Sequence, residues 1–411
     1  MKCEPLGQHA TLIRGITFSP SDKCEPGTPD SVVCLRTSNI QEQLDESDLL
    51  AVPFSLVKSP EKHVRVGDVL VSSANSWNLV GKCCRVTSLR FESTAGGFIS
   101  ILRPTTDRLD PGYLYRWFSW DRTQETVRSF GRQTTNISNL DHKRTLLLPI
   151  PLPPLREQKR IVAILDAAEV LRAKRQKSID QLDSLVQATF WEMFGDPVTN
   201  DHRWDLVSLG EHASKVGSGA TPKGGDAAYK REGITLIRSQ NVHDGDFRLE
   251  GLAFIDTAQA TKLANVEVAE NDVLLNITGA SVARVCRAPR YVLPARVNQH
   301  VCIIRTKPTL NAYFLEKLLM SPSMKRTLLG IGEAGATRQA ITKSEVLRLA
   351  LPLPPVELQA RFASFVRLVE SQKDRLNRHL AQLEMLFVSL QSRAFSGELC
   401  SSSFSRQPAS A

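Results

Sequence analysis

Cysteines are the most reactive side chains of this chain, and they stand at positions 3, 24, 34, 83, 84, 286, 302 and 400. No two of them form a C-x-x-C pair, and no histidines accompany them at the spacing of a zinc site. We therefore expect free thiols and no metal site. The sequence also has no G-x-x-x-x-G-K-[ST] phosphate loop. Each Pro-Pro pair follows a leucine at an expected helix start, unlike the Asn/Asp-Pro-Pro-Tyr/Phe loop of an amino-methyltransferase. We predict no catalytic residues.

A second set of polar side chains lies in turns beside expected strand ends. Arg can pair with guanine, and Asn or Gln with adenine, because each presents two hydrogen-bonding groups to a base edge. A loop Asn more often turns the backbone, and a surface Arg more often meets solvent or a phosphate. The candidates for DNA contact are Arg36, Asn39, Asn75, Lys82, Arg85, Arg132, Gln133 and Asn136, and then Thr221, Lys223, Arg238, Gln240, Asn241, Asn276, Thr278, Arg284, Asn298, Gln299, His300 and Arg338.

Two pairs among these candidates can be ranked. Asn39 and Asn241 match each other in the two halves of the chain, so a structural role in a turn is favoured for them. Arg132 and Arg338 lie in glycine-containing loops before an expected helix, and we rank them first for DNA contact.

The charge balance and hydropathy suit a nucleic-acid partner without requiring one. The chain of 411 residues has 52 basic and 43 acidic residues, a net charge of +9. Such an excess fits a phosphate-facing surface, although many other proteins share it. The N-terminus has no apolar signal core, and no apolar run approaches the roughly 18 to 20 residues that span a bilayer. We expect a cytoplasmic protein without a membrane partner.

The segments that must position these side chains occur twice. The sequence P-L-P-P at 151–154, with Gln158 four residues later, recurs at 352–355 with Gln359. Shorter matches have offsets of 201–204, among them 6–10 with 209–213, 36–40 with 238–242, 68–70 with 272–274, 84–85 with 286–287, and 131–138 with 335–342 at an offset of 204. Such self-similarity indicates a tandem duplication of one α+β unit.

Each copy consists of a body and a helical tail. The first body (residues 1–150) and the second body (residues 201–350) have β-like runs at 68–72, 98–102, 272–276 and 300–304. We expect both bodies to be globular α/β domains. The tails cover 151–200 and 351–399, and Pro154 and Pro355 suit their first helical turns. Residues 400–411 have the composition of a disordered tail.

Apolar residues in the tails alternate at spacings of three and four, which is typical of a coiled-coil seam. A helix of about 40 residues is about 60 Å long, so its apolar stripe is too long to be buried on one small body. We therefore expect the tails to pack on each other, antiparallel, relating the bodies by an approximate two-fold axis. In the alternative, each helix joins the core of its own body. The seam residues are Ile179, Leu182, Val186 and Met193, and then Leu376, Leu380, Leu383, Phe387 and Leu390.

Two similar bodies on a rigid spacer suit the reading of two nearby DNA sites, since DNA presents equivalent positions every helical turn of about 34 Å. At this point the chain resembles a known family, the DNA specificity (S) subunits of type I restriction–modification systems. The resemblance covers residues 6–399. It is carried by the order of the two bodies and tails, the L-P-L-P-P helix starts, Gly219-Ala-Thr-Pro222, and W-E-M-F-G-D at 191–196 followed by Trp204.

The resemblance implies a function for each part. Each body would be a target-recognition domain for one half of a split sequence in double-stranded DNA. The paired tails would set the gap and dock two methyltransferase subunits, which modify adenine N6 with S-adenosylmethionine, and two motor-nuclease subunits, which use ATP and Mg²⁺, can join in some systems. This chain itself would bind no cofactor and catalyse nothing.

Some features depart from that family, and two other functions stay open. The first body has no Trp matching Trp204, and Gly15-Ile-Thr17 is its nearest equivalent to the opening of the second body. The first alternative is a two-headed coiled-coil adaptor that binds proteins and no DNA. The second is a nuclease with an unfamiliar site.

Overall fold

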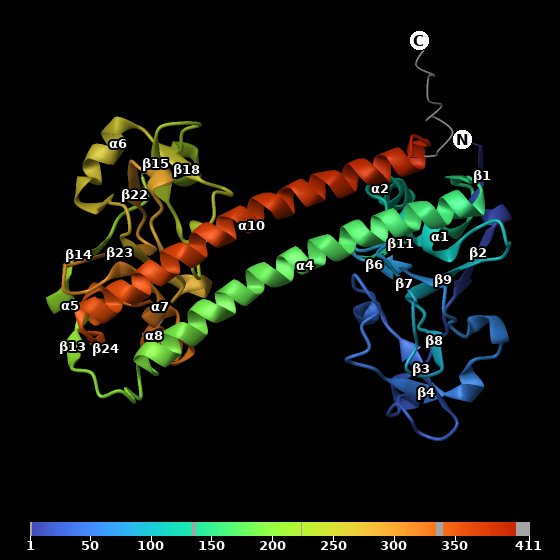
Figure 1. Ribbon diagram of the computed structural model, residues 1–411, viewed down its shortest axis with the longest axis horizontal. Coiled ribbons are helices and arrows are strands. Elements are labelled where there is room, and N and C mark those ends of the chain that lie inside the picture. Colours follow the sequence, from blue (N-terminus) through green and yellow to red (C-terminus); the bar gives the residue numbers. More distant parts are fainter. Residues whose placement is uncertain (1, 134–136, 223, 334–339, 400–411) are drawn as a thin grey trace, which may run out of the picture. The chain divides into compact units, whose positions relative to one another are not determined.

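The computed structural model describes residues 2–133, 137–222, 224–333 and 340–399. The expected tail at 400–411 lies outside this described part. The chain divides into two compact units, of which the first unit is Met1–Gln176 with His379–Ala411 and the second unit is Lys177–Arg378. Each unit therefore contains one body and about half of each long helix, α4 (Leu155–Phe194) and α10 (Val356–Ser396). The expected mixture of sheet-containing bodies and two long helices is confirmed (Figure 1).

The first body is built on two main sheets. The four-stranded sheet has the order β2 (Ala10–Arg14), β9 (Ile99–Pro104), β5 (Val69–Ser72) and β7 (Cys83–Arg85). The second sheet has the order β4 (Ala51–Pro53), β3 (Ser31–Leu35) and β8 (Ser93–Ala95). The smaller elements are β1 (Cys3–Pro5) paired with β12 (Pro149–Pro151), β6 (Ala74–Asn75) with β11 (Ser138–Asn139) and β10 (Arg132–Gln133), and the helices α1 (Pro111–Phe118), α2 (Asp121–Ser129) and α3 (His142–Leu146).

The second body repeats this plan. The first of its two four-stranded sheets has the order β14 (Ala213–Ser218), β23 (Val301–Thr306), β20 (Val273–Asn276) and β21 (Val285–Arg287). The other sheet is β18 (Ala253–Ile255), β15 (Ile234–Ile237), β22 (Ala295–Val297) and β19 (Glu267–Val268). The smaller elements are β13 (Leu206–Ser208) with β24 (Ala350–Pro352), β16 (Val242–His243) with β17 (Asp246–Phe247), and the helices α5 (Leu209–His212), α6 (Thr257–Lys262), α7 (Ala312–Met320), α8 (Pro322–Glu333) and α9 (Lys343–Arg348).

Equivalent polar contacts hold the same elements together in both bodies. Buried Asp68 accepts two hydrogen bonds from Arg103 at 2.7 and 2.6 Å, and Asp272 accepts two from Arg305, both at 2.8 Å. Gln158 of α4 and Gln359 of α10 anchor the starts of the long helices, because each accepts a hydrogen bond from the backbone N–H of the residue that precedes α1 or α7. Such bidentate Arg–carboxylate pairs fix the relative orientation of the two side chains in addition to pairing their charges. Because the same pairs occur in both bodies, the two bodies share one scaffold.

One stretch of the duplication has a different register from the one that we predicted. Leu140 N donates to Ser73 O at 2.9 Å and Ile341 N donates to Ile277 O at 2.8 Å, so Leu140 corresponds to Ile341 at an offset of 201. The offset of 204 predicted for 131–138 is therefore wrong. At offset 201 the end of α2 corresponds to position 330, but α8 continues to Glu333, three residues further. The sequence match at offset 204 aligns the ends of α2 and α8, but it does not align the β-structure that comes after these helices.

The long helices pack against each other inside each unit, in opposite directions. In the first unit the early part of α4 meets the late part of α10, where the Arg172 guanidinium lies 4.9 Å from the centre of the Phe387 ring. In the second unit the late part of α4 meets the early part of α10, where Lys373 forms an ion pair with Asp183. The predicted antiparallel pairing is therefore confirmed. Both helices begin one residue after the prolines, so Pro154 and Pro355 precede the first turn that we predicted for them.

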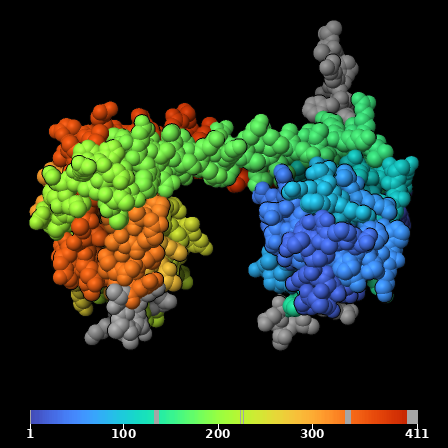
Figure 2. All heavy atoms as spheres, turned by 90° about the horizontal axis from the view of Figure 1, so that it is seen from below, coloured from blue at the N-terminus to red at the C-terminus, as the bar shows by residue number. Residues whose placement is uncertain are grey.

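The predicted seam is the less exposed side of each helix. Ile179, Val186 and Phe387 are buried, and the other predicted members are half-buried. Towards the helix ends the seam also joins the bodies. Phe190 and Phe194 pack on Phe314 of α7 and on Phe362 of α10, and Figure 2 shows this end of α4 (light green) against the orange residues of the second body. There α4 packs on the body of the other copy. The start of each helix also joins the core of its own body, as Ile161 of α4 does in the first and Val366 of α10 in the second, so both predicted arrangements occur.

No helix in the described part of the chain is long and apolar enough to cross a membrane.

Candidate nucleic-acid interface

In the second body, β-sheet register brings five strand ends together. Ser218 of β14 lies opposite Cys302, and Asn276 of β20 lies opposite Val301, so both strands end beside the start of β23. The parallel strands β15 and β22 also end at this edge, where Ile237 lies beside Val297. We call this edge, with the loops that leave it, the strand-end site of the second body. Predicted residues from 221 to 300 meet here although the sequence separates them.

Four predicted side chains form a hydrogen-bonded chain across the strand-end site. The Thr221 hydroxyl donates to Gln299 Oε1, Gln299 Nε2 lies 3.0 Å from His300 Nε2, and His300 Nδ1 contacts the Thr278 hydroxyl. If Gln299 donates its amide N–H, His300 Nε2 accepts and Nδ1 carries the proton. Gln299 is exposed and the other three are half-buried, so the chain holds an exposed amide in a fixed orientation.

The first body has the equivalent strand-end site. Arg14 of β2 lies opposite Ser100, Ser72 of β5 lies opposite Ile99, and Leu35 of β3 lies beside Ala95 of β8. Gly15 and Gly219 occupy corresponding positions, where an added Cβ would lie 2.3 Å from the Ala95 carbonyl oxygen and 1.9 Å from that of Val297. Only glycine permits this approach. The opening of the first body therefore keeps the geometry despite its different sequence.

Several predicted contact residues are buried inside the loops and hold the loop conformation by hydrogen bonds. Asn39 and Asn241 are buried, and each accepts from the backbone N–H of the Arg three residues earlier, at 2.8 and 3.0 Å. Their amide nitrogens donate to loop carbonyls. Asn276 and Asn298 are also buried, with Asn276 donating to Ser239 O at 2.9 Å. Because these amides are buried inside the loops, we now expect them to shape the strand-end sites and not to touch DNA.

Arg85 is turned towards the long helix and away from the strand-end site. It forms an ion pair with Asp166 of α4 at 3.3 Å. Its counterpart Arg287 reaches Glu316 of α7 at 3.1 Å and also pairs with Glu370 of α10. Burial alone would raise the pKa of Glu316, but the charges of Lys317 and Arg287 outweigh it and lower that pKa. We therefore now expect Arg85 to join a body to a helix, and its contact with DNA stays a prediction.

The other described candidates lie at or near the strand-end sites. Lys82 donates to Gln41 Oε1 at 2.7 Å, and Asn75 Nδ2 donates to Ser72 at 3.2 Å. Arg36 pairs with Asp48 at 2.8 Å, and Gln240 donates to Gly251 O at 3.0 Å. Arg238 also contacts the Gly251 carbonyl and lies over the Tyr229 ring, and Arg284 is half-buried between β20 and β21.

Some predictions lie outside the described residues. These are Asn136, Lys223 and Arg338, together with the side chains of Arg132 and Gln133. The two arginines that we ranked first for DNA contact are among them.

The sequence analysis missed a group of exposed apolar side chains at the first strand-end site. Phe98, Trp77 and Ile137 are 64%, 49% and 47% exposed, and Leu79 is 44% exposed. Phe98 begins the run F-I-S-I-L, whose remaining residues enter strand β9, so the sequence pattern suggested a strand interior. Only the structure shows that its ring faces solvent.

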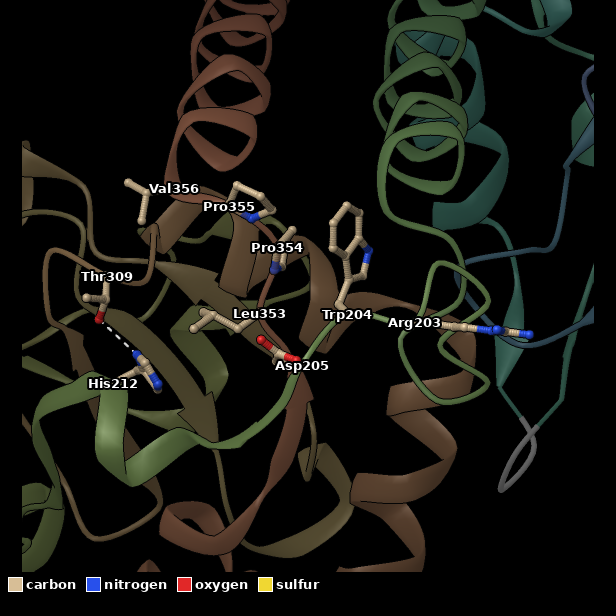
Figure 3. Close-up of a pocket in the computed structure, with 9 residues that line it drawn as sticks. All are labelled: Arg203, Trp204, Asp205, His212, Thr309, Leu353, Pro354, Pro355 and Val356. Atoms are coloured by element: carbon tan, nitrogen blue, oxygen red, sulfur yellow. Dashed lines mark hydrogen bonds between the residues drawn. The ribbon is translucent and has the colours of Figure 1, made fainter.

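A separate cavity of about 410 Å³ lies in the second unit where β13 and β24 meet the start of α10 (Figure 3). It is lined by Trp204, Asp205 and the residues from Leu353 to Val356, among others. His212 in its wall hydrogen-bonds to Thr309 at 2.8 Å, as His9 does to Thr106 in the first body at 3.1 Å. Because that contact recurs, we assign it to the shared scaffold and not to a binding site.

The structure offers no metal centre within the described residues, where no three His, Cys, Asp or Glu side chains cluster suitably. The cysteines of this part have free thiols. Burial raises the pKa of Cys34 and of Cys84 to about 12, and that of Cys302 to about 11. These thiols stay protonated near neutral pH and are unsuited to nucleophilic or ligand roles.

Two matching strand-end sites on one scaffold, with different exposed side chains, define a protein class with two related recognition bodies. Comparison with known proteins identifies the class more closely. Residues 10–181 match the family model of the type I restriction modification DNA specificity domain. The specificity subunit of the EcoKI type I restriction enzyme of Escherichia coli K12 is 23% identical, over 96% of this chain and 88% of that protein. The StySPI specificity subunit of Salmonella potsdam is 24% identical over the same shares.

Solved structures agree in fold. The type I restriction–modification S subunit from M. genitalium has a TM-score of 0.58 at 13% identity, covering 96% of each chain. A chain from a type I R-M system structure on complex assembly and conformational transition has a TM-score of 0.54 at 20% identity, covering 96% of this chain and 99% of that one. The predicted resemblance to type I specificity subunits is confirmed, and with it the main function, DNA-sequence specificity in such a system.

Proposed function

We propose that this chain selects a split DNA sequence, with each body reading one half, and delivers adenine-N6 methyltransferase subunits to it. The observation that carries the proposal is the pair of strand-end sites. The buried residues that hold their loops agree, as Asn39 and Asn241 illustrate, whereas the residues at their surfaces differ, since the exposed Phe98 stands where the second body has the half-buried His300. A shared frame with different exposed residues is expected when two bodies must read different sequences.

The long helices are proposed to set the gap and to dock two methyltransferase subunits. Exposed apolar residues on their outer surfaces support this role, because contiguous apolar surface marks contact sites. In the first unit these residues are Val170, Leu171, Met385, Leu386 and Val388, and in the second unit they are Leu185, Trp191 and Leu368. Figure 2 shows α4 of the first unit (green) lying along the blue and cyan body, with its outer surface free of that body.

Catalysis and cofactors belong, in this proposal, to the partners. The methyltransferase subunits supply S-adenosylmethionine, and motor-nuclease subunits supply ATP and Mg²⁺ where they join. The chain itself acts in the cytoplasm as a non-catalytic subunit.

Salt dependence of DNA binding tests the proposal against the protein-adaptor alternative. The complex with the methyltransferase is titrated onto duplex DNA at several salt concentrations. We expect log K to fall with log salt by about 0.9 per neutralised phosphate. A salt-insensitive association, or no DNA binding by a stable complex, would favour the adaptor. Cleavage by the chain alone in Mg²⁺ would instead favour a nuclease.

A further inference from the structure

The two strand-end sites differ most clearly at one equivalent backbone position. Ser73 N donates to Phe98 O at 2.8 Å, and Ile277 N donates to His300 O at 3.0 Å. The first body thus presents an exposed phenyl ring where the second presents an imidazole in a polar chain. Since the same fold accommodates both, the exposure of Phe98 is not required by the scaffold.

Other exposed apolar residues lie in the segments that adjoin Phe98 in the sheet. Its carbonyl also accepts from Ala74 of β6, and Trp77 and Leu79 lie in the turn that follows this strand. Ile137 precedes β11, the neighbour of β6. Removing such side chains from water is favourable, and folding leaves this gain unused here. An apolar cluster of this kind marks a contact surface.

The position of the cluster indicates what covers it. Asn75 belongs to β6 itself, and Lys82 with its partner Gln41 lies at the same strand-end site. The cluster is therefore continuous with the polar residues that we propose to face DNA. In the major groove, the apolar group on a base edge is the 5-methyl group of thymine. Contact with base faces would require the bases of the duplex to unstack, which is unfavourable.

We propose that Phe98 packs against thymine methyl groups in the half-site of the first body and thereby selects A·T pairs there. This inference rests on the proposed function. The second body, with His300 at the corresponding position, reads its half-site through polar contacts.

Deoxyuridine substitution tests the inference, because uracil lacks only the methyl group. Thymines of the mapped target are replaced in one half at a time, and binding of the methyltransferase complex is measured with the wild type, Phe98→Ala and Phe98→His. We expect the wild type to lose about fourfold in affinity per contacted methyl group in one half. In that half the two Phe98 variants should bind the thymine and uracil duplexes equally. Tyr291→Ala is the matched control, because Tyr291 is 68% exposed in the second body and lies between β21 and β22, away from the strand-end site. It should behave as the wild type.

Two results would overturn the inference while leaving the proposed function intact. In the first, uracil has no effect in either half although the wild type binds its split target specifically. In the second, the Phe98 variants fail to assemble with the methyltransferase, which would assign the cluster to a protein contact. Loss of all sequence-specific binding by the wild type would instead contradict the proposed function itself.

Discussion

At the residue scale, side chains of the same type in neighbouring turns have different roles, and burial separates them. Asn241 is fully buried and makes hydrogen bonds only within its loop, whereas Gln299 is exposed and held from both sides. The sequence showed that both were polar turn residues. It could not show which one pointed outward, because the loop that encloses Asn241 closes through carbonyls of residues 248 and 250.

This difference predicts opposite effects for two Ala substitutions. Asn241→Ala should lower the free energy of unfolding by about 2 kcal/mol, because buried backbone groups lose their partners. Gln299→Ala should change stability by less than about 0.5 kcal/mol and weaken discrimination at one base pair by about 1 to 3 kcal/mol. Urea unfolding and competition binding measure the two effects. Equal losses of stability in both variants would contradict the assigned roles.

At the scale of elements, an ion-pair network joins a strand of the second body to a helix of the same body and to the long helix α10. Arg287 of β21 contacts Glu316 of α7 and Glu370 of α10, and its guanidinium lies 3.6 Å from the centre of the Tyr313 ring. This network keeps the strand-end site at a fixed angle to the long helix. In the first unit Arg85 pairs with Asp166 of α4 at 3.3 Å, and Asp166 also pairs with the buried Arg116 of α1.

Arg287→Ala should destabilise the protein by about 3 to 5 kcal/mol, because it leaves the buried Glu316 charge without one of its partners. The pH dependence should change as well. A lowered carboxyl pKa contributes stability that is present at neutral pH and is lost as the pH falls through that pKa. The variant raises the pKa of Glu316, so its stability should begin to fall at higher pH than that of the wild type. Unfolding midpoints from neutral to acidic pH test this.

Arg85→Ala is the matched control in the first unit. Its side chain is 26% exposed and Asp166 is 34% exposed, so solvent screens the pair and the expected loss is smaller. A loss as large as that of Arg287→Ala would contradict the explanation by burial.

The paired helices should act as the spacer. The ion pairs Arg172–Glu384 and Lys373–Asp183 give the facing register of α4 and α10. Deleting residues 175–181 together with 375–381 removes one heptad from each helix and preserves the seam. At about 1.5 Å per residue and about 3.4 Å per base pair, the gap in the target should shorten by about three base pairs. An unchanged gap with normal assembly would show that the helices do not set it.

At the scale of the whole molecule, the duplication was visible in the sequence because the contacts that build the scaffold are repeated in it. Asp68 and Asp272, which pair with Arg103 and Arg305, are examples, because both carboxylates lie in the matched segments 68–70 and 272–274 that predicted two copies of one body. The exposed side chains were less accessible to prediction. The three extra residues of α8 shifted the register beyond residue 333, and Phe98 belonged to a run typical of a buried strand.

If the two bodies read independently, exchanging one should change one half of the target. Replacing residues 2–150 with the corresponding body of a related specificity subunit should alter one half-sequence and leave the other half and the gap unchanged. The methylation pattern of cells that express the hybrid measures this. Changes in both halves would contradict independent reading.

The most direct test of the central claim is a genome-wide map of N6-methyladenine in cells that express this chain with its methyltransferase. We predict a single split motif, in which two short defined sequences flank a gap of fixed length and unspecified sequence. New methylation at a continuous motif, or none at all from a complex that assembles and binds DNA, would contradict the account of two bodies that each read one half.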